Sequence, residues 1–341
     1  MSYNQLRIAK IIQETPDARS FVLEVPAGLA EKYRYKAGQF LTFRVPDAGG
    51  GGFNRCYSLS SAPETDGLPK VTIKRVAGGK GSNWFHDALK EGGMLDVLPP
   101  AGRFVLGDGD SPLLLFGGGS GITPMMSLIK SALKQGKRQI RLFYANRDRP
   151  SVIFDAEFDA LSKAHPGKLE VIHHLDTTQG IIKPEEIVAA MKGYEAGDVY
   201  LCGPGPFMSL VEETLFEHGM PHDKVRIERF EASGNDAIPV QPGEEGDVIP
   251  NEITIHFEGK AHKVAYAKGQ TILEAARGAG LNPLSSCEEG FCASCAAKTI
   301  KGKVVLAKND IYTPDDLANH WILTCQGHCF GAEVEITYDV V

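Results

Sequence analysis

The sequence predicts a multidomain protein made of an antiparallel β-barrel, a doubly wound α/β domain and a third, smaller domain. Three observations support this division. Short strand-like runs dominate the first hundred residues, strand and helix patterns alternate from Ser111 onward, and a Gly- and Pro-rich acidic segment follows. A chain of 341 residues has room for two or three domains of ordinary size. We expect the domains and the linker to occupy residues 1–108, 109–232, 233–250 (the linker) and 251–341.

The barrel prediction rests on six short runs of apolar and β-branched residues that Gly and Pro clusters separate. These runs lie at 6–12, 20–25, 38–45, 56–61, 71–76 and 94–100. One helix is expected near Ser82–Leu89. Short strands at this spacing are typical of a small antiparallel barrel.

The α/β prediction rests on five apolar runs that alternate with four helical patterns. Strands are expected at 113–116, 139–144, 169–174, 198–202 and 225–230. Helices are expected at 123–134, 155–165, 184–191 and 207–218. Such alternation predicts a parallel sheet with helices on both faces. His173 and His174 are adjacent on one predicted strand and face opposite ways, so we expect both to be structural.

The third domain is preceded by a charged linker. Residues 231–250 hold five carboxylates and no base, so the linker repels itself and is expected to be extended. After it come strand patterns at 252–259 and 261–267, a helix near Ile272–Ala279, further short strands and a final strand at 333–338.

Composition excludes several classes of protein. Hydrophobic residues make up 43% of the chain and charged residues 23%, as in a globular protein, and the formal net charge is −7. No block carries the basic excess that binding to a phosphate backbone requires, which argues against nucleic acid as a partner.

Neither a secretory signal nor a membrane span is expected. Arg7, Lys10 and Glu14 interrupt the N-terminal apolar run. Residues 111–129 carry no charge, but their two prolines and four glycines indicate a strand, a loop and a helix rather than a span. Seven cysteines without an export signal favour a reducing cytoplasm.

Four cysteines have the spacing of a metal cluster. Cys287, Cys292, Cys295 and Cys325 read C-x4-C-x2-C-x29-C, the spacing with which plant-type ferredoxins hold a [2Fe–2S] cluster. Gly290 can take a positive φ, which would let the loop wrap the cluster. The alternatives are structural zinc, a disulfide set or simple burial. Zinc usually needs paired C-x2-C knuckles, and only one such pair occurs here.

Three neighbours of these cysteines have open roles. Cys329 follows Cys325 by four residues and is expected to be a bystander, because Cys325 fits the spacing better. Glu288 and Glu289 form either a solvated acidic edge or a docking surface for a basic redox partner.

Two glycine-containing loops suggest a dinucleotide site. LLLFGGGSGITPMMS (113–127) puts glycines between a buried strand and a helix, and CGPGP (202–206) also follows a strand and begins a helix. Glycines admit a pyrophosphate close to the backbone, and the helix N-terminus supplies N–H donors. The spacing is not G-x-G-x-x-G, and one such loop alone could be a tight turn. Two loops at strand ends favour a dinucleotide crevice.

The barrel sequence carries a candidate flavin site. RCYS (55–58) supplies a cation, an aromatic ring and a hydroxyl, and TIKR (72–75) and GGKGSNW (78–84) follow. Ser82 and Asn83 could cap a helix that points at phosphate. Separately, Arg55 could be a solvated charge, Tyr57 a half-buried strand aromatic and Ser82 an ordinary N-cap. Their co-occurrence makes a flavin site plausible.

The order of these motifs is similar to that of a known family. R-x-Y-S, G-x-G-S, GGGSGITP, CGPGPF, ERF and C-x4-C-x2-C…C together resemble the ferredoxin–NADP reductase superfamily fused to a plant-type ferredoxin. RCYSLSS, LPPAGRFVL, YANRDRPSVIF and RIERF further resemble reductase components of multicomponent oxygenases. Those of 3-ketosteroid 9α-hydroxylases, and next of phenylacetyl-CoA epoxidases, are the most similar. The resemblance implies a β-grasp ferredoxin domain at the C-terminus.

The resemblance also implies roles for individual residues. Ser58 would lie near the flavin N5 edge, Phe230 would cover the isoalloxazine and Cys202 would lie close to the nicotinamide, so these three are the candidate catalytic residues. The flavin-binding residues would be Arg55, Cys56, Tyr57, Ser58, Thr72, Lys74, Lys80, Gly81, Ser82 and Phe230. The nucleotide-binding residues would be Gly118, Gly119, Ser120, Gly121, Thr123, Cys202, Gly203 and Pro204. The family more often has a basic residue at Glu288, which leaves the partner surface in doubt.

The resemblance implies FAD, a [2Fe–2S] cluster and NADH as cofactors. NADH would hand a hydride to flavin N5, and single electrons would then pass through the cluster to a terminal oxygenase or another one-electron acceptor protein. NADPH would require cations for its 2′-phosphate; Arg147 and Arg149 follow a strand, but Asp148 lies between them. We therefore expect NADH. FAD rather than FMN rests on the resemblance alone.

Two alternatives remain. A reductase of the same build could serve a non-oxygenase acceptor such as a hybrid-cluster protein. The chain could also be a non-catalytic binding module with a zinc-stabilised tail. The oxygenase substrate is not expected to touch this chain, so the sequence does not name it.

Overall fold

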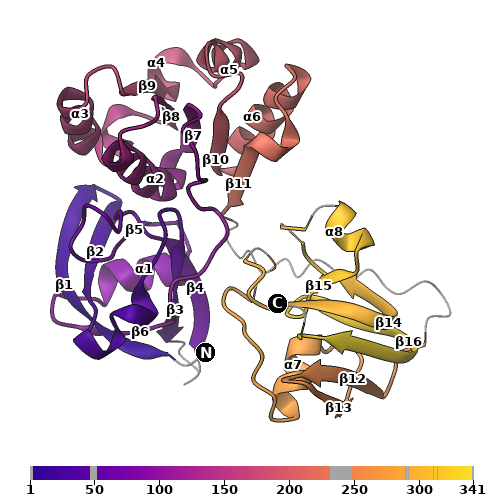
Figure 1. Ribbon diagram of the computed structural model, residues 1–341. Helices are drawn as coiled ribbons and strands as arrows, with labels where there is room; N and C mark the ends of the chain where they lie inside the picture. The colour runs from indigo at the N-terminus through magenta and orange to yellow at the C-terminus, as the bar shows by residue number, and fades with distance from the viewer. Residues whose placement is uncertain are drawn as a thin grey trace. The chain divides into compact units, whose positions relative to one another are not determined.

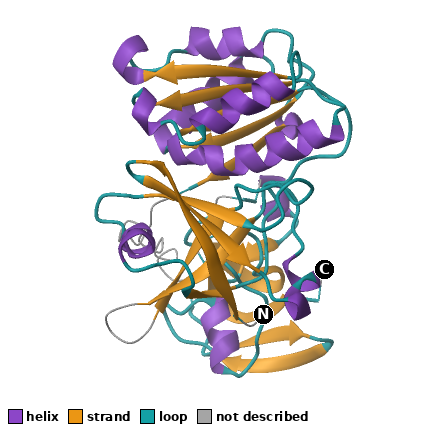
Figure 2. Ribbon diagram, turned by 90° about the vertical axis from the view of Figure 1, so that its left-hand side faces the viewer, coloured by secondary structure: helices purple, strands orange, loops and turns teal. Residues whose placement is uncertain are grey.

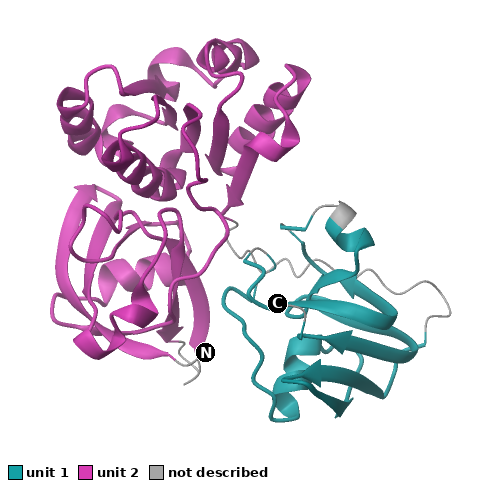
Figure 3. Cartoon of the chain, in the orientation of Figure 1, with its two compact units in different colours: residues 1–2, 233–341 teal, residues 3–232 magenta. Residues whose placement is uncertain are grey.

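The computed structural model describes residues 3–46, 52–230, 248–288, 290, 292–309, 311–312 and 314–339. The chain forms two compact units (Figure 3), a larger unit of residues 3–232 and a smaller unit of residues 233–341 with 1–2. Most of the predicted acidic linker, 233–250, lies outside the described residues. The predicted boundary at 108/109 stays a prediction.

The first part of the larger unit is an antiparallel six-stranded sheet, as predicted (Figure 1). Its strands, in the order β4-β3-β6-β1-β2-β5, are β1 (Asn4–Thr15), β2 (Ala18–Glu24), β3 (Phe40–Pro46), β4 (Gly52–Ser58), β5 (Lys70–Lys74) and β6 (Met94–Val97). The Leu59–Val71 bridge brings the two edge strands together and closes the barrel around an apolar interior. Helix α1 (Lys80–Asp87) contributes Phe85 to that interior.

Strand β4 differs from its predicted position. The sequence pattern predicts a strand at 56–61, but β4 covers Gly52–Ser58 and pairs with β3 from Phe40↔Ser58 to Pro46↔Gly52. Polar residues Asn54 and Arg55 hid the first half of this strand from an apolar pattern. The shift matters because Ser58 is then the last residue of β4.

The second part of the larger unit is a parallel sheet with helices on both faces, as predicted (Figure 2). The strands, in the order β11-β10-β7-β8-β9, are β7 (Leu113–Gly118), β8 (Ile140–Asn146), β9 (Leu169–Leu175), β10 (Asp198–Gly203) and β11 (Val225–Arg229). The helices are α2 (Ile122–Gln135), α3 (Asp155–Ala164), α4 (Asp176–Gln179), α5 (Pro184–Met191) and α6 (Gly205–Glu217). The strand order reverses between β7 and β10, which is where ligands bind in such sheets.

The uncharged run 111–129 forms β7, a turn and α2, as predicted. No helix in the part of the chain that the structure describes is long and apolar enough to cross a membrane. His174 is buried and bonded to Glu186 Oε1 and the Gly180 carbonyl, each at 2.9 Å. His173 faces the other side, toward Tyr144.

A buried arginine fixes the segment that joins the barrel to the α/β domain. Arg138 is 1% exposed and donates to the carbonyls of Gly107 (2.5 Å), Gly109 (3.1 Å) and Ser111 (3.3 Å). It also donates to Asp198 Oδ2 at 2.9 Å. A buried charge is tolerated when it is paired and hydrogen-bonded in this way. The connection is therefore part of the core.

The smaller unit is a mixed five-stranded sheet with one main helix, the β-grasp arrangement. The strands, in the order β13-β12-β16-β14-β15, are β12 (Glu252–Phe257), β13 (Lys260–Ala265), β14 (Ala296–Leu306), β15 (Trp321–Leu323) and β16 (Gly327–Thr337). Helix α7 (Ile272–Gly278) starts with a capping box between Thr271 and Glu274 and packs on the sheet. A short helix, α8 (Pro314–Ala318), precedes β15.

Candidate functional site

Strand β4 carries the first predicted flavin residues on alternate faces. Arg55 lies over the Phe53 ring at 4.5 Å and donates to the Asn54 carbonyl at 2.7 Å. Tyr57 packs edge-on against Phe85, with ring centroids 5.1 Å apart. Cys56 faces the other way, with its Sγ 3.2 Å from Thr42 Oγ1. A flavin on the Arg55–Tyr57 face would therefore not meet the Cys56 thiol.

The N-terminus of α1 meets this face of β4. A Cβ on Gly81 would lie 2.8 Å from Arg55 Cγ and 3.2 Å from the Tyr57 hydroxyl, so a larger residue would have to displace the Arg55 side chain. Lys80 begins the same turn. A helix N-terminus with an arginine beside it suits a phosphate group. This is the part of the predicted flavin site that the structure brings together most closely.

The expectation that Ser82 or Asn83 caps α1 is wrong. Gly79 occupies the N-cap and no side chain caps the helix. Ser82 Oγ accepts from the Val76 amide at 3.1 Å, and Asn83 Oδ1 accepts from Arg75 at 3.0 Å. The two side chains fix the turn before α1.

On β5, the two predicted residues point to different places. Thr72 is 3% exposed, and its Oγ1 lies 2.7 Å from both Ser20 Oγ and Ser60 Oγ. Lys74 Nζ lies 3.8 Å from the Asp17 carboxylate and 4.0 Å from the position of a Cβ on Gly119. Lys74 thus reaches from the barrel to the glycine loop, whereas the Thr72 hydroxyl is engaged in a buried chain.

The two predicted glycine loops are packed directly on each other. A Cβ on Gly121 would lie 2.2 Å from the Cys202 carbonyl oxygen, and one on Gly118 would lie 2.8 Å from Pro204 Cδ. A Cβ on Gly203 would lie 3.0 Å from Gly118 Cα. These glycines are therefore required for backbone contact between the ends of β7 and β10. The predicted dinucleotide crevice would lie beside this contact.

Two side-chain hydroxyl groups hold the glycine loop. Thr123 Oγ1 donates to the Ser120 carbonyl at 3.1 Å, so its hydroxyl is committed to the turn. Tyr144 Oη donates to the Gly119 carbonyl at 3.1 Å and accepts from the Ile153 amide at 3.2 Å. Sequence reasoning missed Tyr144, because an apolar strand pattern gives no sign that its hydroxyl supports a loop.

A cluster of three polar side chains lies where the barrel meets the sheet. Ser58 Oγ donates to Glu228 Oε2 at 3.0 Å, and Glu228 on β11 is in register with Cys202 on β10. Burial raises the pKa of Glu228 to about 8, although the bond from Ser58 acts in the opposite direction. Burial, and then the charge of Glu228, raises the pKa of the Cys202 thiol.

Sequence reasoning selected Ser58 and Cys202 but missed Glu228. The motif RIERF does contain the residue, yet an acid on an edge strand is ordinarily a solvated charge. Phe230 follows Glu228 by two residues and is 39% exposed, an unusual exposure for a phenylalanine. An exposed ring beside this cluster is available to cover a planar ligand.

The four predicted cluster cysteines are all buried and gather as two pairs. The Sγ atoms of Cys295 and Cys325 lie 3.3 Å apart. Cys292 Sγ accepts from the Cys287 amide at 3.5 Å. Hydrogen bonding with Cys287, opposed by burial and supported by Ser294, lowers the pKa of Cys292 to about 6. A thiol that ionises readily is suited to binding iron.

The pairing fits a cluster of two irons, each held by two thiolates. In the described ranges, no group of three or more His, Cys, Asp or Glu side chains converges on one point that could hold a single metal ion. Gly290 has a φ of +81°, as predicted, and Glu288 and Ala293 also have positive φ, so the backbone curves around the cysteines. The donor set therefore suits a [2Fe–2S] cluster.

Cys329, Glu288 and Glu289 lie near the four cluster cysteines in the sequence. Cys329 packs in the main apolar core of the smaller unit, whereas Cys295 and Cys325 belong to a second cluster, which supports its role as a bystander. Glu288 Oε1 accepts from Arg277 at 2.6 Å, so its charge is paired. Glu289 lies outside the described residues.

Comparison with known families divides the chain in the same way. Residues 5–106 match the oxidoreductase FAD-binding domain, 115–213 the oxidoreductase NAD-binding domain and 255–329 the 2Fe-2S iron-sulfur cluster binding domain. These three domains define an electron-transfer oxidoreductase. They confirm the predicted fold class and the predicted cofactor classes.

Individual relatives extend over nearly the whole chain. The ferredoxin reductase component of 3-ketosteroid-9-alpha-monooxygenase from Rhodococcus rhodochrous is 42% identical over 94% of this chain and 93% of its own length. A component of 1,2-phenylacetyl-CoA epoxidase from Escherichia coli strain K12 is 29% identical over 99% of this chain and 98% of its own. The structure of phthalate dioxygenase reductase is 27% identical, with a TM-score of 0.62 and 98% coverage of both chains.

The chain belongs to the family of three-domain oxygenase reductases that includes the ferredoxin reductase components of 3-ketosteroid-9-alpha-monooxygenases. Membership confirms the resemblance seen in the motifs. It also confirms the prediction of an electron-transfer enzyme over that of a non-catalytic binding module.

Proposed function

We propose that the chain oxidises NADH and delivers electrons one at a time to the terminal oxygenase component of a multicomponent system. The observation that carries this proposal is the hydrogen bond from Ser58 of the barrel to Glu228 of the α/β domain, beside Cys202. Hydride transfer needs two reacting atoms held about 3–3.5 Å apart, and this junction joins the flavin-side strand to the nucleotide-side loops. Bound FAD supplies a two-electron acceptor, and a bound [2Fe–2S] cluster supplies one-electron transfer.

On the flavin side, Arg55 and the first turn of α1 bind the phosphate groups. The close approach of Gly81 to Arg55 supports this role, because the helix N-terminus and the guanidinium then share one anion. Tyr57 would pack on the flavin, and its ring is held by edge-on packing against Phe85. Lys74, whose Nζ lies near the loop at Gly119, would also meet the flavin phosphates.

On the nucleotide side, Gly118–Gly121 bind the dinucleotide through backbone N–H groups. Cys202, Gly203 and Pro204 would contact the nicotinamide, and Phe230 would cover the flavin ring. The exposed ring of Phe230 supports this role.

The Ser58–Glu228–Cys202 cluster keeps the reaction site uncharged. Because the pKa of Glu228 is about 8, its carboxyl is largely protonated at neutral pH and can share a proton with Ser58 Oγ. The thiol of Cys202 stays neutral for the same reason of burial. A neutral, dry pocket suits the nicotinamide ring and excludes water from the hydride path.

The preference for NADH rests on two ion pairs after β8. Arg147 Nε donates to Asp148 Oδ2 at 2.8 Å, and Arg149 Nη2 lies 2.7 Å from Asp155 Oδ1. Both guanidinium groups are thus paired with carboxylates, which would also repel a 2′-phosphate. NADPH would have to displace these acids, and NADH would not.

The proposed partner is a terminal oxygenase, because relatives that match most of this chain are named as reductase components or subunits of monooxygenases. Seven cysteines, all without a disulfide in the structure, favour the reducing cytoplasm as their compartment.

An anaerobic titration with NADH tests the proposal directly. Loss of flavin absorbance together with partial bleaching of a broad iron–sulfur band is the expected result. A flavin that bleaches without any iron–sulfur band, even after reconstitution of the cluster, would contradict the assignment of the cysteines. A more than tenfold advantage of NADPH in kcat/KM would overturn the donor assignment.

A further inference from the structure

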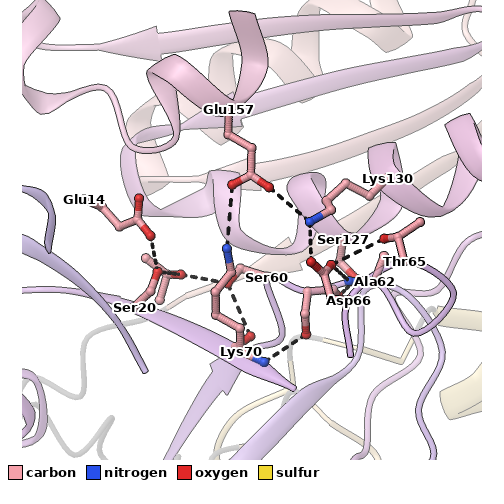
Figure 4. A network of polar contacts seen from close by, with 12 residues as sticks. Glu14, Ser20, Ser60, Ala62, Thr65, Asp66, Lys70, Ser127, Lys130 and Glu157 are labelled. Carbon is pink, nitrogen blue, oxygen red and sulfur yellow. Dashed lines mark hydrogen bonds and ion pairs between the residues drawn. The ribbon is translucent and has the colours of Figure 1, made fainter. Parts of the chain in front are cut away.

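The loop between β4 and β5, residues 59–69, lies against α2 of the α/β domain (Figure 4). Three residues of α2 at helical spacing i, i+3 and i+4 contact it. Ser127 Oγ donates to the Ser61 carbonyl at 2.6 Å, Lys130 Nζ to Asp66 Oδ1 at 2.6 Å and Ser131 Oγ to Glu64 Oε2 at 2.5 Å. One face of α2 is therefore attached to one barrel loop.

Lys130 is the centre of this attachment. Its Nζ also donates to Glu157 Oε1 of α3 at 3.0 Å, and its side chain is only 11% exposed. Lys70, at the start of β5, lies 3.6 Å from the other oxygen of Glu157. Two nearly buried lysines and two carboxylates that are 25% and 33% exposed thus form a chain of ion pairs, Asp66–Lys130–Glu157–Lys70. Salt screens such a network far less than an exposed pair.

The ammonium group of Lys130 stays protonated at neutral pH. Burial alone would lower the pKa of its ammonium group, but the hydrogen bonds and charges of Asp66 and Glu157 outweigh it and raise the pKa. Asp66 in turn accepts from the Ala62 amide at 2.7 Å, which holds the loop in its turn. The base of the loop is fixed as well, since Ser60 Oγ lies 2.7 Å from Thr72 Oγ1.

The network joins the two elements that hold the reacting groups. The loop begins directly after Ser58, the last residue of β4, and α2 begins directly after the glycine loop at Gly121. A shift of α2 relative to the loop would therefore move the nucleotide-side wall relative to Ser58. Misplacement of reacting atoms by about 1 Å can cost about 10²-fold in rate.

We propose that Lys130 is a positioning residue for hydride transfer, which holds α2 and the glycine loop in register with the flavin-side strand through Asp66 and Glu157. This inference rests on the proposed function, because it concerns the hydride step from NADH to flavin. Lys130 itself is assigned no contact with either cofactor.

The test measures anaerobic flavin reduction in the full-length holoprotein under single-turnover conditions. The variants are Lys130→Met and Lys130→Arg. The control is Arg7→Met, which removes a solvent-exposed ion pair with Glu24 between two strands of the barrel. We expect Lys130→Met to lower the limiting rate with saturating NADH at least tenfold. Reduction of the same flavin by dithionite, which needs no docked nucleotide, should stay within twofold of wild type. Lys130→Arg should recover at least half of the limiting rate that Lys130→Met loses.

Two outcomes would overturn the proposal. One is a limiting rate of Lys130→Met within twofold of wild type, whatever its melting temperature. The other is an equal loss of the dithionite-driven rate, which would indicate a damaged flavin site. If Lys130→Met does not fold, Glu157→Gln replaces it in the test. This variant removes only one partner of Lys130 and should lower the limiting rate at least threefold. An unchanged rate would again overturn the proposal. Failure of wild type to accept hydride from NADH would instead contradict the proposed function.

Discussion

At the junction of barrel and α/β domain, Ser58 contacts Glu228, which follows it by 170 residues, whereas in the cysteine loop Cys287 contacts Cys292, five residues away. The first contact exists only if two domains pack correctly. The second depends on local backbone, including positive φ at Gly290. In the proposed function, the larger unit uses this interdomain contact to align a hydride donor and acceptor, whereas the smaller unit needs only a stable loop to hold its metal ligands.

The largest effect is expected from a substitution that disrupts the cysteine loop and leaves the junction of barrel and α/β domain intact. Cys295→Ala should abolish the iron–sulfur absorbance and electron delivery to an acceptor protein, because one iron then lacks a thiolate. NADH-driven flavin reduction should remain within twofold of wild type. Cys329→Ala is the matched control and should retain the cluster, as its thiol packs in the other core. If flavin reduction fell together with the cluster, the two regions would not be independent.

A smaller effect is expected at the junction. Ser58→Ala removes the donor to Glu228 and should lower the rate of flavin reduction by NADH about 10²-fold, the lower end of what a positioned proton-bearing group contributes. Stopped-flow absorbance of the flavin measures this rate. Ser285→Ala, in the smaller unit, serves as the control. An unchanged rate in Ser58→Ala would mean that the contact only joins domains.

Donor choice gives a third, more modest effect. Asp148→Asn keeps an acceptor for the Ser151 amide, now bonded at 3.0 Å, but removes the charge that pairs with Arg147. The ratio of kcat/KM for NADH to that for NADPH should fall about tenfold, equivalent to about 1.4 kcal/mol and within the range of a charge-assisted hydrogen bond. A ratio that does not change would exclude Arg147 from the 2′-phosphate region.

The smallest effect is a pH dependence of stability. The pKa of Glu228 is about 8 in the folded chain, above its ordinary value of 4.5. As pH rises through this interval, the unfolded chain loses the proton first, so the stability contributed by protonated Glu228 is lost toward pH 8. Glu228→Gln cannot ionise, and its Tm relative to wild type should rise by at least about 3 °C between pH 5 and pH 8.5. Parallel Tm profiles would contradict a raised pKa.

Local sequence patterns predicted the three domains, both glycine loops and the cluster-binding cysteine loop, because each depends on patterns of neighbouring residues. They did not predict what depends on distant neighbours. Glu228 gains its role from Ser58, and Lys130 from Asp66, which is 64 residues earlier. The start of β4 was missed because Asn54 and Arg55 are polar, and the cap of α1 was misassigned because Gly79, without a side chain, occupies the N-cap.

The buried Arg138 has a consequence for how such reductases can be recombined. Domain exchange between relatives is commonly planned at a connecting segment, here residues 107–111. In this chain three carbonyls of that segment are bonded to Arg138, whose charge is balanced by Asp198. A chimaera joined there inherits its connector from one parent and its arginine from the other. Exchange of the ferredoxin domain at the acidic segment before residue 251 keeps Arg138 and all its partners in one parent.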